Sequence, residues 1–348
     1  MEERSALIGM SGGVDSSVAA WLIQQQGIRC IGGTMLLHDS AAGTEDAAQV
    51  ANKLGIPFHI FDLCDAFRTQ VMDDFTRCYE AGLTPNPCIR CNKTLKFGAF
   101  LEQALSMGCS FVVTGHYARI AYDEATGRNL MKKAADLPKD QTYFLYSLNQ
   151  HQLAHTLFPL GDLTKEQVRA IAERQGFLNA RKKDSQDICF IPDGDYTAFL
   201  QRYTGKAYPC GDFLDQNGKV VGQHCGAVSY TIGQRKGLGL AMGAPVYVCG
   251  KDMQANTVTV GSNDALFKTT LRADDWNFIA FDNLSSPLRC KAKARSRMTE
   301  QSCTVYPEEN GFCRVVFDEP QRALTPGQAV VLYDGDLVLG GGTIREVL

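Results

Sequence analysis

The fold is decided by a stretch near the start of the chain, which reads Ala6-Leu7-Ile8-Gly9-Met10-Ser11-Gly12-Gly13-Val14-Asp15-Ser16-Ser17. The apolar run 6–10 predicts a buried strand, and Val14, Val18 and Leu22 recur at the spacing of one helix face. The glycines between them allow a tight turn and a close approach of the backbone to a ligand. Because the N–H groups of such a loop and of the next helix's first turn point at an anion, the stretch predicts a phosphate-binding loop.

The side chains of this loop narrow its chemistry. Ser11, Ser16 and Ser17 add hydroxyl donors, and the carboxylate of Asp15 is suited to a metal ion that bridges phosphates. A Walker loop would carry a lysine before its Ser or Thr, and this loop has none. The seven residues from Ser11 to Ser17 resemble the PP-loop of ATP pyrophosphatases, which cleave ATP to AMP and pyrophosphate while adenylating a substrate. The loop alone does not choose among the members of that superfamily.

Strand-like and helical patterns alternate outward from the loop. Further strands are predicted near 28–37, 58–63 and 111–114, and helices over 44–54, with Thr44 as N-cap, and around 96–105. This alternation predicts a doubly wound parallel α/β sheet. After about residue 195, turn dipeptides predict hairpins at Asn217-Gly218, Asn310-Gly311 and Asp334-Gly335. We therefore expect a catalytic α/β domain over 1–196, a small β-rich central domain over 197–269 and a C-terminal β-barrel over 270–348.

Bulk composition excludes several classes. The chain has 348 residues, 45% of them hydrophobic and 21% charged, with a net charge of −3. It has no long uncharged apolar run and no signal-like start, so we expect a cytoplasmic protein without a membrane anchor. Its 13 cysteines are then expected to be reduced. Ten of them lack any motif and are interpreted as small apolar fillers.

The other three cysteines lie in motifs. Cys88 and Cys91 follow two prolines in Thr84-Pro85-Asn86-Pro87-Cys88-Ile89-Arg90-Cys91-Asn92-Lys93, at the expected entry to a helix, where the dipole lowers a thiol pKa. A structural zinc site normally needs a second Cys pair or a His pair, which is missing, and a redox pair stays open. The third, Cys189, follows the polar run Lys182-Lys183-Asp184-Ser185, whose cations favour a reactive thiolate.

A basic stretch indicates RNA. Its cations all fall on odd positions, Arg289, Lys291, Lys293, Arg295 and Arg297. Because strand side chains alternate between faces, a strand here would project all of them from one side. In a chain that is acidic as a whole, this predicts a phosphate-binding surface.

Together with further motifs, these stretches resemble the bacterial tRNA-uridine 2-sulfurtransferases, or tRNA-specific 2-thiouridylases, of the PP-loop superfamily. The matching motifs run in order through the chain: the PP-loop, Thr84 to Asn92, Thr114 to Tyr117, Lys139 to Leu145, Asp184 to Pro192, Gly233 to Gly239 and Thr325 to Gln328. The resemblance implies ATP-dependent 2-thiolation of the wobble uridine of tRNA, by adenylation of uracil O2 and sulfur transfer from a cysteine persulfide.

The resemblance also implies roles for residues. ATP, with Mg²⁺, would bind Gly9, Met10, Ser11, Gly12, Gly13, Val14, Asp15 and Ser16, with Met35 and Gly115 near the adenosine. The target base would meet Asn86, Pro87 and Cys88, and tRNA would contact His116, Lys139, Asp140, Gln141, Arg295, Ser296 and Gln328. Cys189 would carry the persulfide, supplied by a cysteine desulfurase or a sulfur-relay protein. Cys91 would be the nucleophilic partner thiol, with a transient Cys91–Cys189 disulfide.

One residue departs from the family pattern and opens an alternative. Many members carry an aspartate three positions before the partner cysteine, and this chain has Cys88 there. Cys88, Cys91 and Cys189 could instead hold a [4Fe–4S] cluster whose open iron carries sulfide. Two other hypotheses are a PP-loop enzyme that adenylates a small molecule and a non-catalytic RNA-binding or iron–sulfur module. The first leaves the thiols and the basic stretch unexplained, and the second leaves the phosphate loop without a purpose.

Overall fold

The predicted parallel sheet forms the base of the first domain. The computed structural model describes residues 4–38, 43–177 and 188–348. The strand order is β3-β2-β1-β4-β7, every pairing is parallel, and the strands are β1 (Ser5–Gly9), β2 (Arg29–Leu36), β3 (Phe58–Asp62), β4 (Phe111–Val113) and β7 (Thr156–Leu157). Loop and helix follow β1 as predicted, so the α/β class is confirmed.

Helices cover both faces of this sheet. Ile8 of β1 is buried with α1 (Val14–Gln25), α2 (Thr44–Leu54) and α8 (Lys165–Arg174). Leu7 points the other way and packs with Phe97 and Phe100. The start of α2 differs from expectation, because Thr44 is its first residue and the cap is Gly43, whose φ is +86°. Its end at Gly55, with φ +65°, is confirmed.

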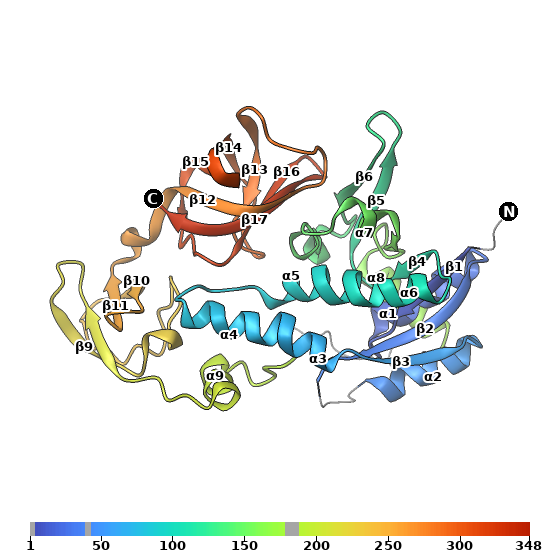
Figure 1. Cartoon of the computed structure of the whole chain (residues 1–348), viewed down its shortest axis with the longest axis horizontal. Helices are drawn as coiled ribbons and strands as arrows, with labels where there is room; N and C mark the ends of the chain where they lie inside the picture. Colours follow the sequence, from blue (N-terminus) through green and yellow to red (C-terminus); the bar gives the residue numbers. More distant parts are fainter. Residues whose placement is uncertain (1–3, 39–42, 178–187) are drawn as a thin grey trace.

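Two long helical arms extend from the sheet and form a hairpin (Figure 1). The first arm joins α3 (Cys64–Phe67), a π-helical segment (Arg68–Met72) and α4 (Asp73–Glu80). The second joins α5 (Pro87–Cys91), a π-helical segment (Asn92–Ala99) and α6 (Phe100–Ser106). Residues 81–86 link the arms at a tip far from the sheet, which we call the hairpin tip. α7 (Gln150–Ala154) completes the helices of this domain.

The middle of the chain forms a small β domain. α9 (Tyr196–Thr204) leads into a four-stranded sheet of order β10-β11-β8-β9, with strands β8 (Gly211–Leu214), β9 (Val220–His224), β10 (Tyr247–Asp252) and β11 (Thr257–Gly261). β8 and β9 are antiparallel and are joined through Asn217-Gly218, where Gly218 has φ +81°. This predicted hairpin is therefore confirmed.

The C-terminal strands close into a barrel (Figure 1). They are β12 (Phe267–Phe278), β13 (Leu288–Lys293), β14 (Gln301–Pro307), β15 (Cys313–Arg322), β16 (Ala329–Asp334) and β17 (Leu337–Val347), and the β12–β17 pairing closes the ring. Asn310-Gly311 connects β14 to β15, and Asp334-Gly335 connects β16 to β17, so both predicted hairpins are confirmed.

One barrel neighbour was not predicted from sequence. The hairpin of β5 (Ala118–Asp123) and β6 (Arg128–Lys133) belongs to the first domain but extends the barrel's sheet through the pair Leu337–Lys132. Short 3₁₀ helices span Leu137–Lys139, Thr142–Phe144, Ala227–Ser229, Asn263–Leu266 and Glu309–Gly311. Among the described residues, no helix is long and apolar enough to cross a membrane.

Candidate active site

The phosphate loop is held in shape by its own hydroxyls. Ser16 Oγ accepts from the Ser11 N–H at 3.2 Å and donates to the Gly13 carbonyl at 3.0 Å. Gly12 has φ +70°, and a Cβ there would lie 2.3 Å from the Gly43 carbonyl oxygen, so no other residue fits. The loop is therefore preorganised at the N-terminus of α1, where backbone N–H groups and the dipole favour an anion.

The residues expected around the adenosine lie beside this loop. A Cβ on Gly115 would lie 2.7 Å from the Asp15 carbonyl carbon and 2.8 Å from the Ser16 nitrogen, so the segment after β4 packs directly on the loop. Met35 is half-buried near the end of β2, two residues after Gly33, whose carbonyl accepts from the Met10 N–H at 2.8 Å. The structure thus brings the predicted ATP-binding residues together at one edge of the sheet.

A lysine that sequence reasoning missed also reaches the loop. Lys165, the first residue of α8, places its Nζ 2.8 Å from both carboxylate oxygens of Asp15. The Tyr117 hydroxyl donates to the same carboxylate at 2.9 Å. The Lys165 side chain is only 10% exposed, so the charge is held in place. The cation that a Walker loop carries in its own sequence here comes from a helix 150 residues further along the chain.

The two thiols of α5 differ in their surroundings. Asn86 caps α5 by accepting from the Cys88 N–H at 3.2 Å, and Pro87 occupies the first turn, as its fixed φ favours. Cys91 is buried in an apolar cluster with Phe67 and Leu95, whereas Cys88 is exposed. The predicted extended segment and helix entry therefore exist and direct one thiol inward and one outward.

Cys189 reaches the same place from another part of the chain. It is exposed, and its neighbour Phe190 packs edge-on against Phe67 at 5.5 Å and Phe75 at 5.4 Å between ring centroids. This aromatic anchor fixes the segment against the first helical arm, close enough for the charges of Cys91 and Cys189 to affect each other. The preceding Lys182-Lys183-Asp184-Ser185 run lies outside the described residues.

The predicted lowering of the thiol pKa values is wrong. Burial raises the pKa of Cys91 to about 11, and desolvation by the surrounding protein raises the pKa values of Cys88 and Cys189 even though both residues are partly open to solvent. Desolvation is the largest cause of the raised pKa at each of the three thiols. Lys96 lies near all three thiols and opposes the rise. Sequence reasoning did not identify Lys96, although it follows Cys91 on the same helical arm.

The thiols do not form a metal-ligand set in this conformation. Within residues 4–38, 43–177 and 188–348, no group of three or more His, Cys, Asp or Glu side chains is arranged to hold a metal ion. All three cysteines lie in those ranges. The donors present therefore do not fit a [4Fe–4S] cluster without rearrangement.

Several expected tRNA contacts have structural partners. His116 packs between Phe97 and Phe158, and burial keeps its pKa well below the usual value, so it is neutral. Asp140 accepts from the Ala134 N–H and the Thr142 hydroxyl. Gln141 accepts from the Tyr117 N–H at 2.9 Å, and Lys139 is half-exposed beside it. This segment supports Tyr117 and through it Asp15, and its tRNA contacts stay predictions.

The hairpin tip is the point where three domains meet. Thr84 donates its N–H to the Pro326 carbonyl at 2.9 Å, and its own carbonyl accepts from the Gln328 side chain at 2.7 Å. A Cβ on Gly327 would lie 2.7 Å from the Thr84 nitrogen, so the barrel turn fits the tip closely. Arg295 links the same turn to the central domain through the Thr325 hydroxyl and the Ile232 carbonyl, at 2.5 and 3.1 Å.

The basic stretch is not one continuous strand face. β13 ends at Lys293, and the chain bends at Arg295 and turns at Ser296 and Arg297. Arg289 is paired with Asp318, while Lys291 is exposed with no carboxylate of the described residues in ion-pair distance. The expectation of five cations on one face is therefore wrong, because the strand covers only three of them.

Gln328→Met is expected to separate its two candidate roles. Because the Gln328 side chain bonds to Thr84, its loss should loosen the segment that carries Asn86, and kcat for the thiolation that the resemblance implies should fall about tenfold while the dissociation constant for tRNA stays unchanged. Steady-state kinetics and filter binding measure the two quantities. Gln301→Met is the matched control, since that side chain bonds to the carbonyl of nearby Thr299, at 3.4 Å, and not to another domain among the described residues. A weaker tRNA affinity with unchanged kcat would show a direct tRNA contact instead.

A phosphate loop between β1 and α1 of a parallel sheet, without a Walker lysine, defines this chain as an ATP-using enzyme of the PP-loop class. Family models match the tRNA methyl transferase HUP domain over residues 4–193, the tRNA methyl transferase PRC-barrel domain over 197–262 and the Aminomethyltransferase beta-barrel domain over 268–344. The chain is 47% identical over 359 residues to tRNA-specific 2-thiouridylase MnmA of Acetivibrio thermocellus. The alignment covers 99% of this chain and 100% of that protein.

A second relative, tRNA-specific 2-thiouridylase MnmA of Symbiobacterium thermophilum, is 49% identical over 362 residues and covers 99% of this chain and 93% of its own length. The chain belongs to the tRNA-specific 2-thiouridylase family. The solved structure of NMN synthetase from Francisella tularensis aligns with 59% of this chain and 78% of its own chain. The TM-score is 0.36 and the sequence identity is 16%, so this likeness carries no argument.

Proposed function

We propose that this chain thiolates C2 of the wobble uridine of tRNA, using ATP to activate the uracil oxygen and a cysteine persulfide as the sulfur source. The observation that carries the proposal is one cation, Lys96, near three thiols that approach from two separate segments. The second helical arm that carries two of these thiols packs on the sheet that bears the phosphate loop. The relatives' name, thiouridylase, fits this pairing of loop and thiols better than the methyl transferase of the domain description.

The first half of the reaction is adenylation. Uracil O2 attacks the α-phosphorus of ATP, the bond to pyrophosphate breaks, and the O2-adenylate forms. The loop N–H groups and Lys165 would bind phosphate oxygens, where fixed donors stabilise the charge that develops. Asp15 would hold Mg²⁺ through one carboxylate, with waters and phosphates as the other ligands, which is the usual arrangement for this ion. When bound, Mg²⁺ neutralises phosphate charge.

The second half is sulfur transfer. The terminal sulfur of the Cys189 persulfide attacks C2, and AMP leaves with the former O2. The Cys91 thiolate then attacks Cys189 Sγ, which breaks the S–S bond, leaves the sulfur on the base and forms a Cys91–Cys189 disulfide. A dithiol reductant restores both thiols, and a persulfide donor, either a cysteine desulfurase or a sulfur-relay protein, reloads Cys189.

Exposure supports this division of roles. Cys189 is accessible to a donor protein, whereas Cys91 is buried beside it. With its pKa near 11, Cys91 is mostly a neutral thiol at neutral pH, so its attack on Cys189 Sγ would use the small thiolate fraction that the nearby Lys96 favours. We therefore favour the persulfide route over the cluster, whose ligand geometry the described residues do not provide.

The test is an assay with defined components. Enzyme is incubated with ATP, magnesium, a cysteine desulfurase with cysteine, and unmodified tRNA, and 2-thiouridine and AMP are quantified by mass spectrometry. We expect one AMP per 2-thiouridine, in anaerobically purified protein free of iron. AMP without thiolated RNA would indicate a small-molecule adenylating enzyme, and neither product a binding module. Activity that requires bound iron would establish the cluster route.

A further inference from the structure

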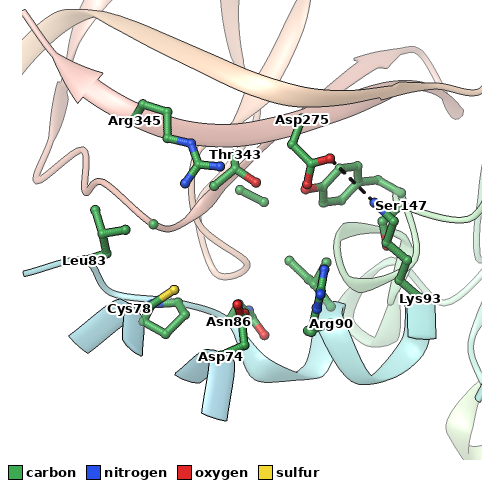
Figure 2. A pocket seen from close by; sticks show the side chains of 15 residues that line it. Asp74, Cys78, Leu83, Asn86, Arg90, Lys93, Ser147, Asp275, Thr343 and Arg345 are labelled. Carbon is green, nitrogen blue, oxygen red and sulfur yellow. Dashed lines mark ion pairs between the residues drawn. The ribbon is translucent and has the colours of Figure 1, made fainter. Parts of the chain in front are cut away.

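A cavity of about 170 Å³ lies between the hairpin and the barrel (Figure 2). Arg90 of α5 enters from the lower wall in this view, and Arg345 of β17 enters from the upper wall. The cavity has walls from two domains and is separate from the phosphate loop. One of its lining residues, Asn86, has a role expected above, at the target base, and Arg90, Arg345 and Ser147 have none.

The cavity is on the opposite side of α5 from the thiols. Cys88 and Cys91 lie three residues apart on one helix face, and Arg90 and Lys93 lie on the other, since successive residues are about 100° apart around the axis. Asn86 belongs to both sides, because it caps α5 at Cys88 and also lines the cavity. A ligand in the cavity would therefore contact the same residue, Asn86, that is expected to meet the target base.

Two arginines of the lining keep guanidinium N–H donors for a ligand, whereas the one lysine is paired. Lys93 is paired with Asp275 at 3.7 Å, the ion pair drawn in Figure 2. Arg345 bonds to Asp274 at 2.5 Å through Nε alone, which leaves its terminal nitrogens for another partner. Arg90 bonds to the Gln70 carbonyl through Nε, and no carboxylate of the described residues lies within ion-pair distance of it. Two guanidinium groups facing each other suit a phosphate, which they bind through paired N–H donors.

A buried hydroxyl gives independent support for a ligand. Ser147 lines the cavity, is 5% exposed, and its Oγ has no hydrogen-bond partner among the described residues. Leaving a buried hydroxyl unsatisfied costs free energy, so such groups normally have a partner. A polar group in the cavity would supply it.

We propose that this cavity binds the nucleotide that flanks the target uridine, with Arg90 and Arg345 on its phosphate and Ser147 on its base. The inference rests on the proposed function and deepens it. Recognition of splayed single-stranded nucleotides is the usual way in which proteins read RNA loops. Because the walls come from two domains, the cavity would make thiolation depend on the barrel as well as on the catalytic domain.

The test is a double-mutant cycle that combines one substitution in the enzyme with one chemical change in the RNA. The substrates are an anticodon stem-loop RNA and the same RNA with one neutral methylphosphonate linkage at a flanking position, tested on each side of the target in turn. The enzymes are wild type, Arg90→Gln and, as a matched control, Arg169→Gln, an exposed arginine on α8. KM and kcat for 2-thiouridine formation are measured for each combination.

Either change alone is expected to raise KM about tenfold with little effect on kcat, and both together no further, since they remove the same contact. Effects that multiply to about a hundredfold for both linkages would overturn the proposal. Inhibition of wild type but not of Arg90→Gln by inorganic phosphate, with no coupling between Arg90→Gln and either RNA change, would also overturn the proposal. The cavity would then bind a free anion. Ser147→Ala paired with an abasic flanking nucleotide repeats the cycle with a change that preserves the fold. Absence of thiolation by wild-type enzyme would instead refute the proposed function.

Discussion

Cys189→Ser is expected to lower 2-thiouridine formation by about 10³-fold or more, because the sulfur carrier itself is removed. Pyrophosphate release in a single turnover should persist, since adenylation uses the phosphate loop and not this thiol. Quench-flow separation of pyrophosphate and 2-thiouridine measures both steps. Cys210→Ser is the control, as Cys210 is also exposed but lies before the central sheet.

The pH dependence of the thiols provides a second readout for this prediction. Burial raises the pKa of Cys189, so its thiolate fraction, and with it alkylation by iodoacetamide, is expected to rise about tenfold per pH unit below that pKa. Cys91, with a pKa of about 11, should react more slowly still at neutral pH. Full thiolation by Cys189→Ser, with loss in Cys88→Ser, would contradict the assigned carrier.

Lys165→Met is expected to lower ATP-dependent pyrophosphate release by about 10²- to 10³-fold, which is the typical cost of removing one fixed donor from developing charge. Because Lys165 is buried against Asp15, its loss also removes the cation from that carboxylate, which keeps its hydrogen bond from the Tyr117 hydroxyl. The increase in melting temperature that ATP and magnesium produce should therefore shrink, since ligand binding stabilises the folded state by mass action.

Two variants test whether the effect comes from charge at the loop. Lys165→Arg keeps the cation and should retain more activity than Lys165→Met, and Lys219→Met, at an exposed lysine of the central domain, should behave as wild type. An equal loss in Lys165→Arg and Lys165→Met, with a lower melting temperature in both, would reduce the role of Lys165 to packing. A normal rate of pyrophosphate release in Lys165→Met would refute it as a phosphate ligand.

Local patterns predicted much of the fold. The apolar run before Ser11 and the helical spacing after Val14 give β1 and α1, and glycine-containing turn dipeptides give the hairpins, because each signal lies within a few residues. The β5–β6 hairpin was missed, since its turn has Thr126-Gly127 in place of an Asn-Gly or Asp-Gly pair and the hairpin is completed by barrel strand β17. Cys210 and Cys225 are exposed and were wrongly interpreted as apolar fillers.

The basic stretch shows why an alternating pattern can mislead. Alternation of cations predicts a shared face only while the backbone stays extended, and β13 ends at Lys293. Beyond that point Arg295 turns inward and bonds to Thr325 and Ile232. A residue expected at an RNA surface thus joins two domains.

The sequence by itself determined the phosphate loop, the parallel sheet, the three-thiol set and the family, because these depend on short stretches whose residues act together. Tertiary structure alone decided which distant groups complete them. It brings Lys165 to Asp15 across 150 residues and Gln328 to Thr84 across 244. It also decided the thiol pKa values, since burial by the packed arms, and not the helix position read from sequence, sets the cost of a charged sulfur.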